Sequence, residues 1–229
     1  MKYDMAVLTS NSSQEYDRGV LKTIPYYENI HAETIDLIAH VVSQPVHWVD
    51  TGCGTGRLVI DAVHQFPKTR FTLADPSEEM LKMAKISLAG TKNCTYVQAG
   101  TESLPLPDQS TDVITAILAH HYLDAAGRAK AIRNCFRILR PGGVLVSCEH
   151  TAPRTEYGFK IAAARWKDWQ IRAGKPADAA TSYIARYGSA FFPIKASEHF
   201  SLLEKCGFSL AEILYASYCD IVFYAIKPS

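Results

Sequence analysis

The stretch Val49-Asp-Thr-Gly-Cys-Gly-Thr-Gly-Arg57 lies where a β-rich run gives way to an amphipathic one. Its glycines at alternate positions let the backbone approach a ligand closely and adopt angles that other residues avoid. The N-terminus of the helix expected behind them favours a carboxylate or a phosphate group. The stretch therefore predicts a strand, a ligand-binding turn and a helix, and it implies a nucleotide-like ligand.

The spacing of these glycines argues against a nicotinamide dinucleotide. In the dinucleotide fingerprint the third glycine comes one residue later, where this chain has Arg57. Asp50, just before the turn, would repel phosphates but can accept a hydrogen bond from the ammonium group of an amino acid. Asp75 ends the next β-rich run, where a carboxylate can take both hydroxyls of a ribose. The pattern thus favours a ligand with an amino-acid part and a nucleoside part.

Short β-rich runs alternate with amphipathic stretches on both sides of this turn, as in a parallel sheet flanked by helices. The predicted strands are residues 46–51, 70–74, 95–99, 112–118 and 144–149, and the predicted helices are residues 57–66, 78–88, 128–139 and 196–205. Pro141-Gly-Gly143 is expected to stop the third helix. Residues 208–214 and 219–226 predict an antiparallel hairpin joined around residues 215–218. The fold class is therefore α/β, a Rossmann-like, doubly wound, seven-stranded and mostly parallel sheet with an antiparallel C-terminal strand.

Composition limits the other possibilities. With 229 residues, 48% hydrophobic and 21% charged, the chain is expected to form one domain with one core. The net charge is +1 and the basic residues are scattered along the sequence, which argues against nucleic acid as a partner. No apolar run is long enough to span a membrane, and the N-terminus lacks the pattern of a signal peptide. Six widely spaced cysteines fit reduced thiols, so we expect a cytoplasmic protein without membrane partners.

Residues 46–150 resemble the class I S-adenosylmethionine-dependent methyltransferases. The matching segments are residues 50–56, 73–81, 99–105, 112–114 and 139–143. The resemblance implies S-adenosylmethionine as cofactor, and it assigns each contact to particular residues of this chain. Its methionine part would be held by Asp50, Gly52, Cys53, Gly54 and Gly56, its ribose by Asp75, its adenine by Pro76, Met80, Gly100, Thr101 and Glu102, and its lower side by Ala119. Thr101 stands where the family usually has an aspartate that accepts from the adenine amino group.

The N-terminal segment carries a second resemblance. Residues 16–18 and 24–27 look like the lid helix of a subgroup that includes carboxy-S-adenosylmethionine synthase. There the tyrosine at the place of Tyr27 touches the cofactor. Aromatic packing of Tyr16, Tyr26 and Tyr27 onto the domain is the alternative interpretation. The arginine that reads the additional carboxylate in that subgroup has no counterpart in residues 190–195, so plain methyl transfer is preferred.

Three histidines follow the predicted fourth and fifth strands, at the edge of the sheet where α/β proteins bind ligands. They are His120, His121 and His150. A neutral imidazole there can take a proton from a hydroxyl or an amine, so all three are candidate catalytic bases, with packing as the competing role. No spacing of ligands supports a metal site, and none is predicted.

Residues 151–192 interrupt the alternating pattern with an aromatic insertion. Phe159, Ala162, Trp166 and Trp169 fall on one face of a helix, and Tyr183, Tyr187, Phe191 and Phe192 are expected to complete an aromatic cap over the sheet edge. The single methyltransferase domain is thus divided into an N-terminal lid (1–40), a cofactor-binding core (41–150), the cap insertion (151–192) and a C-terminal helix and hairpin (193–229).

The predicted function is methylation of a small-molecule acceptor by in-line transfer from S-adenosylmethionine. The alternatives are a carboxy-S-adenosylmethionine synthase-like enzyme, a non-catalytic S-adenosylmethionine-binding module and, more distantly, a nicotinamide oxidoreductase. The acceptor and the atom methylated stay open, because acceptor specificity depends on the cap, where the sequence is least informative. The oligomeric state, a homodimer included, stays open as well.

Overall fold

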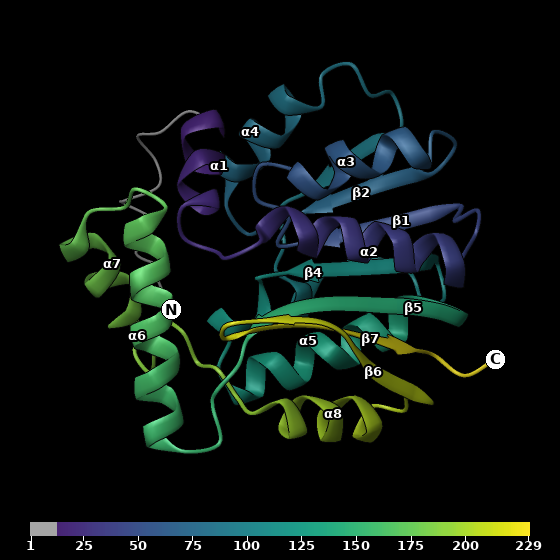
Figure 1. Cartoon of the computed structure of the whole chain (residues 1–229). Helices are drawn as coiled ribbons and strands as arrows, with labels where there is room; N and C mark the ends of the chain where they lie inside the picture. Colours follow the sequence, from purple (N-terminus) through teal and green to yellow (C-terminus); the bar gives the residue numbers. More distant parts are fainter. Residues whose placement is uncertain (1–12) are drawn as a thin grey trace.

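The computed structural model describes residues 13–229, and its centre is one seven-stranded sheet (Figure 1). The strands follow the order β3-β2-β1-β4-β5-β7-β6. Their bounds are β1 His47–Thr51, β2 Arg70–Ala74, β3 Cys94–Val97, β4 Thr111–Ile117, β5 Leu139–His150, β6 Leu210–Ser217 and β7 Asp220–Ile226. The first five strands are parallel, while β7 runs antiparallel to both of its neighbours. This arrangement confirms the predicted fold class.

Helices cover both faces of the sheet (Figure 1). On one face lie α2 (Tyr27–Val41), α3 (Arg57–Gln65) and α4 (Glu78–Ser87), and on the other lie α5 (Ala125–Ile138) and α8 (Ala196–Lys205). Each face has its own hydrophobic cluster: Ile38, Leu58 and Trp48 belong to one, and Ile132 and Leu203 to the other. The helices bury their apolar sides against strands that are apolar on both faces, as a parallel sheet requires.

Three further helices lie beyond the carboxyl ends of the parallel strands (Figure 1). They are α1 (Ser13–Leu21), α6 (Glu156–Arg172) and α7 (Ala177–Ile184). Trp166 of α6 is fully buried, and its indole nitrogen donates to the carbonyl oxygen of Thr23 at 2.7 Å. The insertion therefore packs against the segment that joins α1 to α2, although the first twelve residues of the predicted lid lie outside the described residues.

Two sequence-based expectations about element ends are wrong. The third predicted helix ends at Ile138, before Pro141 as expected, but β5 begins at Leu139 instead of residue 144 and therefore includes Pro141-Gly-Gly143. Gly142 has φ of +75°, so the glycine bends the start of the strand where another residue would be strained. The hairpin connection is shorter than predicted, because Ser217 already pairs with Asp220 and Tyr218 takes the left-handed conformation that a tight turn needs.

Within residues 13–229, no helix combines the length and the apolar character that crossing a membrane would require.

Candidate cofactor and acceptor site

The glycine-rich turn has the geometry that its sequence predicts. Gly52, Gly54 and Gly56 all have positive φ, between +53° and +79°. A Cβ on Gly52 would lie 2.5 Å from the Cβ of Ala119, whereas one on Gly54 would meet no atom within 4 Å. Gly52 thus lets the turn lie directly against the end of β4, and Gly54 leaves open space above it. Ala119, which was predicted to lie beneath the cofactor, is therefore next to the glycine-rich turn.

Asp75 links the end of β2 to this turn. Its carboxylate accepts from the backbone N–H of Gly54 at 3.0 Å and from that of Ser77 at 2.9 Å. Burial raises the pKa of Asp75, and these two hydrogen bonds act in the opposite direction. Each carboxylate oxygen keeps a lone pair beyond these bonds. The residue is therefore fixed in direction and can still accept from the hydroxyls of a ribose.

Asp50, at the carboxyl end of β1, is only 3% exposed. The hydroxyl of Thr115 donates to its Oδ1 at 2.7 Å. Burial raises the pKa of Asp50 to about 7, the charge of Asp75 adds to this effect, and the bond from Thr115 opposes it. A buried carboxylate of this kind is stabilised by a cation, which is what the ammonium group of a methionine moiety supplies. Asp50 therefore fits the role predicted for it.

The residues predicted around the adenine are divided between the surface and the core. Met80 is buried in the first turn of α4, while Pro76 is exposed. The carboxylate of Glu102 folds back over Gly100, within 2.7 Å of where a Cβ of that glycine would stand. These residues stay candidates for the adenine contact.

Thr101 differs from the prediction. Its hydroxyl lies 2.7 Å from the hydroxyl of Thr51 and 3.1 Å from Nε2 of His120. It is 6% exposed. Because both contacts are made inside the protein, the geometry does not favour the hydroxyl of Thr101 as the group that accepts from the adenine amino group.

The N-terminal segment contacts the glycine-rich turn directly. The hydroxyl of Thr55 donates to Oδ1 of Asp17 in α1 at 2.7 Å. Tyr27, the first residue of α2, is half-buried, and its pKa is well above the ordinary value because of burial and the nearby Tyr16, Asp17 and Asp50. Tyr27 therefore lies close to the buried carboxylate of Asp50, and it stays a candidate for the cofactor contact.

His120 and His121 are buried beside the carboxylate of Glu149 on β5. Nδ1 of each imidazole lies 3.6 Å from a Glu149 oxygen, one on each side of the carboxylate. Burial lowers the pKa of His121 to about 3. For Glu149, burial acts to raise the pKa, but the surrounding histidines outweigh it and hold the pKa at about 2. Both histidines thus belong to an interior polar cluster.

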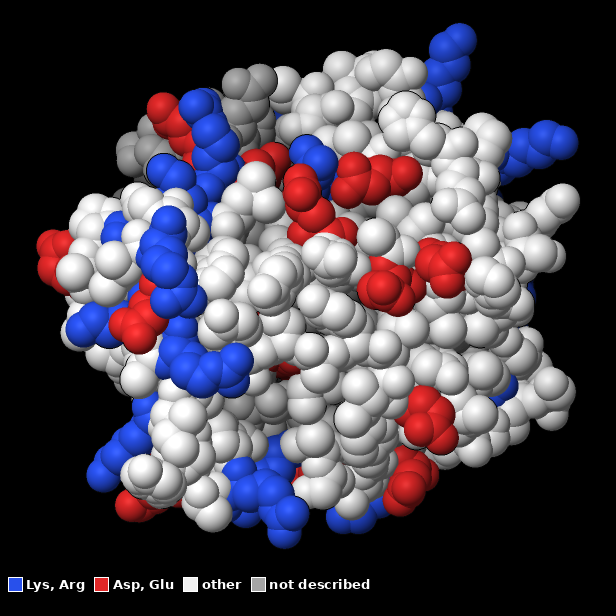
Figure 2. All heavy atoms as spheres, in the orientation of Figure 1, with Lys and Arg blue, Asp and Glu red and all other residues white. Residues whose placement is uncertain are grey.

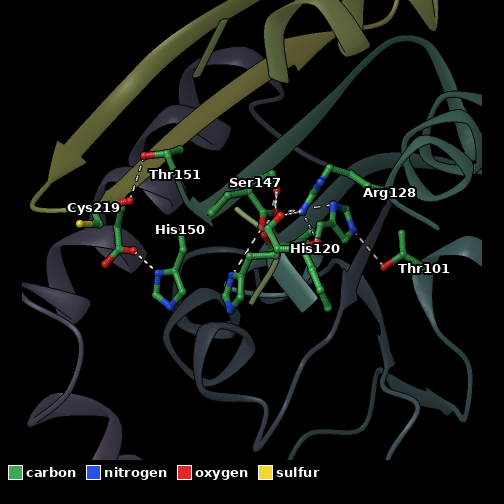
Figure 3. Close-up of polar contacts among 12 residues, drawn as sticks. Thr101, His120, Arg128, Ser147, His150, Thr151 and Cys219 are labelled. Atoms are coloured by element: carbon green, nitrogen blue, oxygen red, sulfur yellow. Dashed lines mark hydrogen bonds and ion pairs between the residues drawn. The ribbon is translucent and has the colours of Figure 1, made fainter. Parts of the chain in front are cut away.

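His150 ends β5 and has a different set of partners. Its Nδ1 is hydrogen bonded to Oδ1 of Asp220, and its Nε2 lies 3.2 Å from the hydroxyl of Tyr183. Its ring stacks on that of His121, with centroids 4.0 Å apart. The close-up shows His120 directed toward Thr101 near Arg128, and His150 on the other side, toward Cys219 (Figure 3). The three predicted histidines therefore meet at one edge but have different environments.

Several residues of this edge carry no signal in the sequence. Asp220 reaches His150 because the antiparallel register of β5 and β7 places the two opposite each other. Arg128 of α5 donates to the carbonyl oxygens of His120, at 3.3 Å, and Phe192, at 2.5 Å. It thereby attaches the cap to the end of β4. A hydrophobic pattern predicts strands but not the register between strands far apart in sequence, so these contacts escaped prediction.

The predicted aromatic cap is assembled in the structure. Tyr183 contacts Trp166 and Phe191 with ring centroids 5.4 and 5.2 Å apart, and Phe159 contacts Tyr187 at 5.2 Å. An open groove of about 520 Å³ runs along the start of α6 and has Tyr187 in its wall. On the face shown in Figure 2, the Lys and Arg side chains gather mainly over the cap, where α6 exposes Lys160, Arg165 and Arg172. The cap thus combines an aromatic interior with a basic rim.

Comparisons with known proteins agree with this geometry. Residues 49–143 match the family described as methyltransferase domain. The ubiquinone/menaquinone biosynthesis C-methyltransferase UbiE of Shewanella sediminis is 35% identical over 49% of this chain and 49% of its own length. The chain thus spans about half the length of the curated relatives it matches.

Two solved structures share the fold over almost the whole chain. A possible exported protein from Bordetella parapertussis has a TM-score of 0.71 and 16% identity, covering 99% of this chain and 84% of that one. Human N-acetylserotonin methyltransferase, solved with S-adenosylmethionine, has a TM-score of 0.65 and 15% identity, covering 98% and 59%. Fold, glycine-rich turn and matched segment agree, and they give S-adenosylmethionine as the cofactor. Residues 49–143 thus form a methyltransferase domain, and the chain around them has the class I methyltransferase fold.

Proposed function

We propose that the protein transfers a methyl group from S-adenosylmethionine to a small-molecule acceptor by in-line displacement. The observation that carries the proposal is the pair of buried carboxylates, Asp50 and Asp75, on either side of the open glycine-rich turn. When bound, the sulfonium supplies an activated methyl group. The protein then has to hold an acceptor close to that carbon and keep water away.

Each part of the site has a task in this proposal. Asp50 binds the ammonium group and Asp75 the ribose, with Gly52, Gly54 and Tyr27 around the methionine part. The cap over the carboxyl edge encloses the acceptor with its aromatic rings, which suits a small and partly apolar molecule. His120, His121 and His150 are the candidates for taking a proton from the acceptor.

Calorimetric titration with S-adenosylmethionine and S-adenosylhomocysteine tests the cofactor site. Asp75→Asn keeps the shape of the side chain but removes the charge. We expect it to weaken the binding of both ligands by about tenfold or more, because one charge-assisted hydrogen bond is lost. Asp36→Asn, on the exposed side of α2, is the matched control and should leave both affinities unchanged.

Turnover is tested by incubating the protein with S-adenosylmethionine and a panel of hydroxyl and amine acceptors while S-adenosylhomocysteine is measured. Formation of S-adenosylhomocysteine together with a methylated product supports methyl transfer. Tight binding with no turnover on any acceptor favours a binding module instead. Consumption of prephenate without a methylated product favours the synthase-like activity.

A further inference from the structure

We propose that His150, held by Asp220, is the general base of the transfer and takes the proton of a hydroxyl acceptor through the hydroxyl of Tyr183. The inference rests on the proposed function, and it adds two residues, Asp220 and Tyr183, to the chemistry of the site.

The pairing of His150 with Asp220 fixes the imidazole. Both side chains are almost fully buried, and the carboxylate accepts from Nδ1–H of His150. With the proton held on Nδ1, Nε2 carries the lone pair and can accept a proton. The buried carboxylate also stabilises the imidazolium that results. This is the arrangement of a base and the residue that orients it.

Tyr183 occupies the accepting side of this imidazole. Its hydroxyl donates to Nε2 of His150 at 3.2 Å. Burial, together with the nearby Tyr122, holds the pKa of Tyr183 well above the ordinary value, so the hydroxyl keeps its proton and can donate it. A phenol in this position passes a proton on without being ionised itself.

The same hydroxyl belongs to a polar group that reaches the cofactor residues. Electrostatic interactions couple Tyr183 to Tyr122 and Tyr16, and they couple both of these tyrosines to Asp75. The guanidinium of Arg186 lies 5.6 Å from the ring of Tyr183 and interacts with the hydroxyl of Tyr122. An acceptor oxygen placed among these hydroxyls lies between the carboxylate of Asp75 and the imidazole of His150. The guanidinium of Arg186 beside it stabilises the negative charge that the oxygen gains when it loses its proton.

The proton transfer balances without another reactant. The acceptor O–H bond breaks and its proton passes to the oxygen of Tyr183, while the proton of Tyr183 forms a new N–H bond at Nε2 of His150. The acceptor lone pair is then free to form the bond to the methyl carbon, and the electron pair of the carbon–sulfur bond stays on sulfur. The positive charge lost by the sulfonium is matched by the imidazolium, which Asp220 neutralises.

The other two histidines are less suited to this task. Nε2 of His120 is engaged by Thr101, and its Nδ1 faces Glu149. Neither nitrogen of His121 has a hydrogen-bond partner within the described residues, and burial holds its pKa at about 3. Within the described part of the chain, only His150 of the three has Nδ1 hydrogen bonded to a carboxylate, because Nδ1 of His120 and of His121 lies 3.6 Å from the nearest Glu149 oxygen.

The titratable side chains in contact with His150 come from four elements or segments. They are Asp220 of β7, His121 of the short helix η3 (His120–Tyr122), Tyr183 of α7 and Tyr187 of the segment after it. Tyr187 contacts the imidazole by ring stacking, with centroids 5.9 Å apart. Tyr157 of α6 is 74% exposed, so Tyr157→Phe removes a hydroxyl from the surface and serves as the matched control for Tyr183→Phe.

The test uses 4-nitrophenol as the acceptor probe, because its anion absorbs visible light and its neutral form does not. The probe is added to the protein with saturating S-adenosylhomocysteine, at a pH where free probe is mostly protonated. We expect the wild type and Tyr157→Phe to bind it as the phenolate. The fraction of bound probe in the phenolate form should fall by about tenfold or more in three variants, His150→Gln, Asp220→Asn and Tyr183→Phe. A tenfold fall corresponds to a rise of about one unit in the pKa of the bound probe.

The outcomes separate this inference from the proposed function. Ionisation of the bound probe that persists in His150→Gln overturns the assignment of the base, and a wild-type complex that binds no probe overturns the hydroxyl class of acceptor. Binding of S-adenosylhomocysteine is measured in the same samples by calorimetry, and its failure counts against the cofactor site alone. Tyr183→Phe removes one oxygen atom only, so it keeps the test decisive if a histidine variant does not fold.

Discussion

The two buried carboxylates of the cofactor site differ in what holds them. Asp75 accepts two backbone hydrogen bonds, from Gly54 and Ser77, while Asp50 accepts one from Thr115 and lies deeper in the molecule. Hydrogen bonds to the ionised form offset the cost of burying a charge. The pKa of Asp50 accordingly lies at about 7, near neutral pH.

We predict that cofactor affinity depends on pH through Asp50. Below about pH 7 its carboxyl group is mostly protonated in the free protein, and an ammonium ligand prefers the ionised form. S-adenosylhomocysteine should therefore bind more tightly as pH rises from about 5.5 toward 7, by up to tenfold per unit, with release of a proton. Calorimetry in buffers of different ionisation enthalpy measures that release.

Asp50→Asn removes the titrating group, so its weaker affinity should be flat over the same range. A wild-type affinity that does not change with pH would contradict the role of Asp50.

The raised pKa of Asp50 also makes the stability of the folded protein depend on pH. Because the folded pKa is raised from 3.8, Asp50 favours folding at acidic pH, and this contribution is lost as pH rises through about 7.

At the scale of elements, α1 depends on its neighbours. The helix has 9 residues, fewer than an isolated helix needs for stability in water. Its Asp17 accepts from the buried hydroxyl of Thr55 in the glycine-rich turn. The position of α1 over the cofactor site is therefore linked to the conformation of the turn itself.

We predict that Thr55→Val loosens α1 without unfolding the domain. The substitution keeps the shape of the side chain but leaves Asp17 without that donor, which costs about 1 kcal/mol. Amide hydrogen exchange across α1 should accelerate by about fivefold, the same energy expressed as a rate. Thr181→Val removes a hydroxyl that bonds only to Ala177 within α7 and should leave α1 unchanged. Unaltered exchange in α1 would mean that other contacts hold the helix.

At the scale of the whole molecule, the cap shares its interior with the sheet. Trp166 of α6 is fully buried, donates to Thr23 and contacts the ring of His150 with centroids 5.0 Å apart. Arg128 and the backbone of His121 hold the other side of the cap through Phe192. We therefore expect the N-terminal segment, the cap and the sheet to unfold together.

We predict that Trp166→Ala lowers the free energy of unfolding of the whole domain by about 3–5 kcal/mol, the usual cost of emptying a buried tryptophan site. Urea denaturation followed by far-ultraviolet circular dichroism should show one transition, shifted to lower urea. Tyr157→Ala on the same helix is the control, because that side chain is 74% exposed and its loss should cost less than about 0.5 kcal/mol. A separate early transition in Trp166→Ala would show instead that the cap unfolds on its own.

The sequence by itself determined the elements whose signals are local. The alternating pattern predicted each strand of the sheet, and the helix at 196–205 matches α8 residue for residue. Gly52, Gly54 and Gly56 adopt positive φ angles because glycine has no Cβ. Asp75 was predicted from its place at the end of a strand. Such features depend on neighbours along the chain, so residue type and spacing are enough to predict them.

Tertiary structure alone decided which side chains meet at the carboxyl edge. Asp220 was not predicted as a partner of His150, since only the register of β5 and β7 joins residues 70 positions apart. Two further features were missed for the same reason. They are the contacts of Thr101 with Thr51 and His120, and the position of Pro141 inside β5. Local patterns specify the backbone of each element, whereas contacts between distant elements depend on register and packing, which appear only when the whole chain has folded.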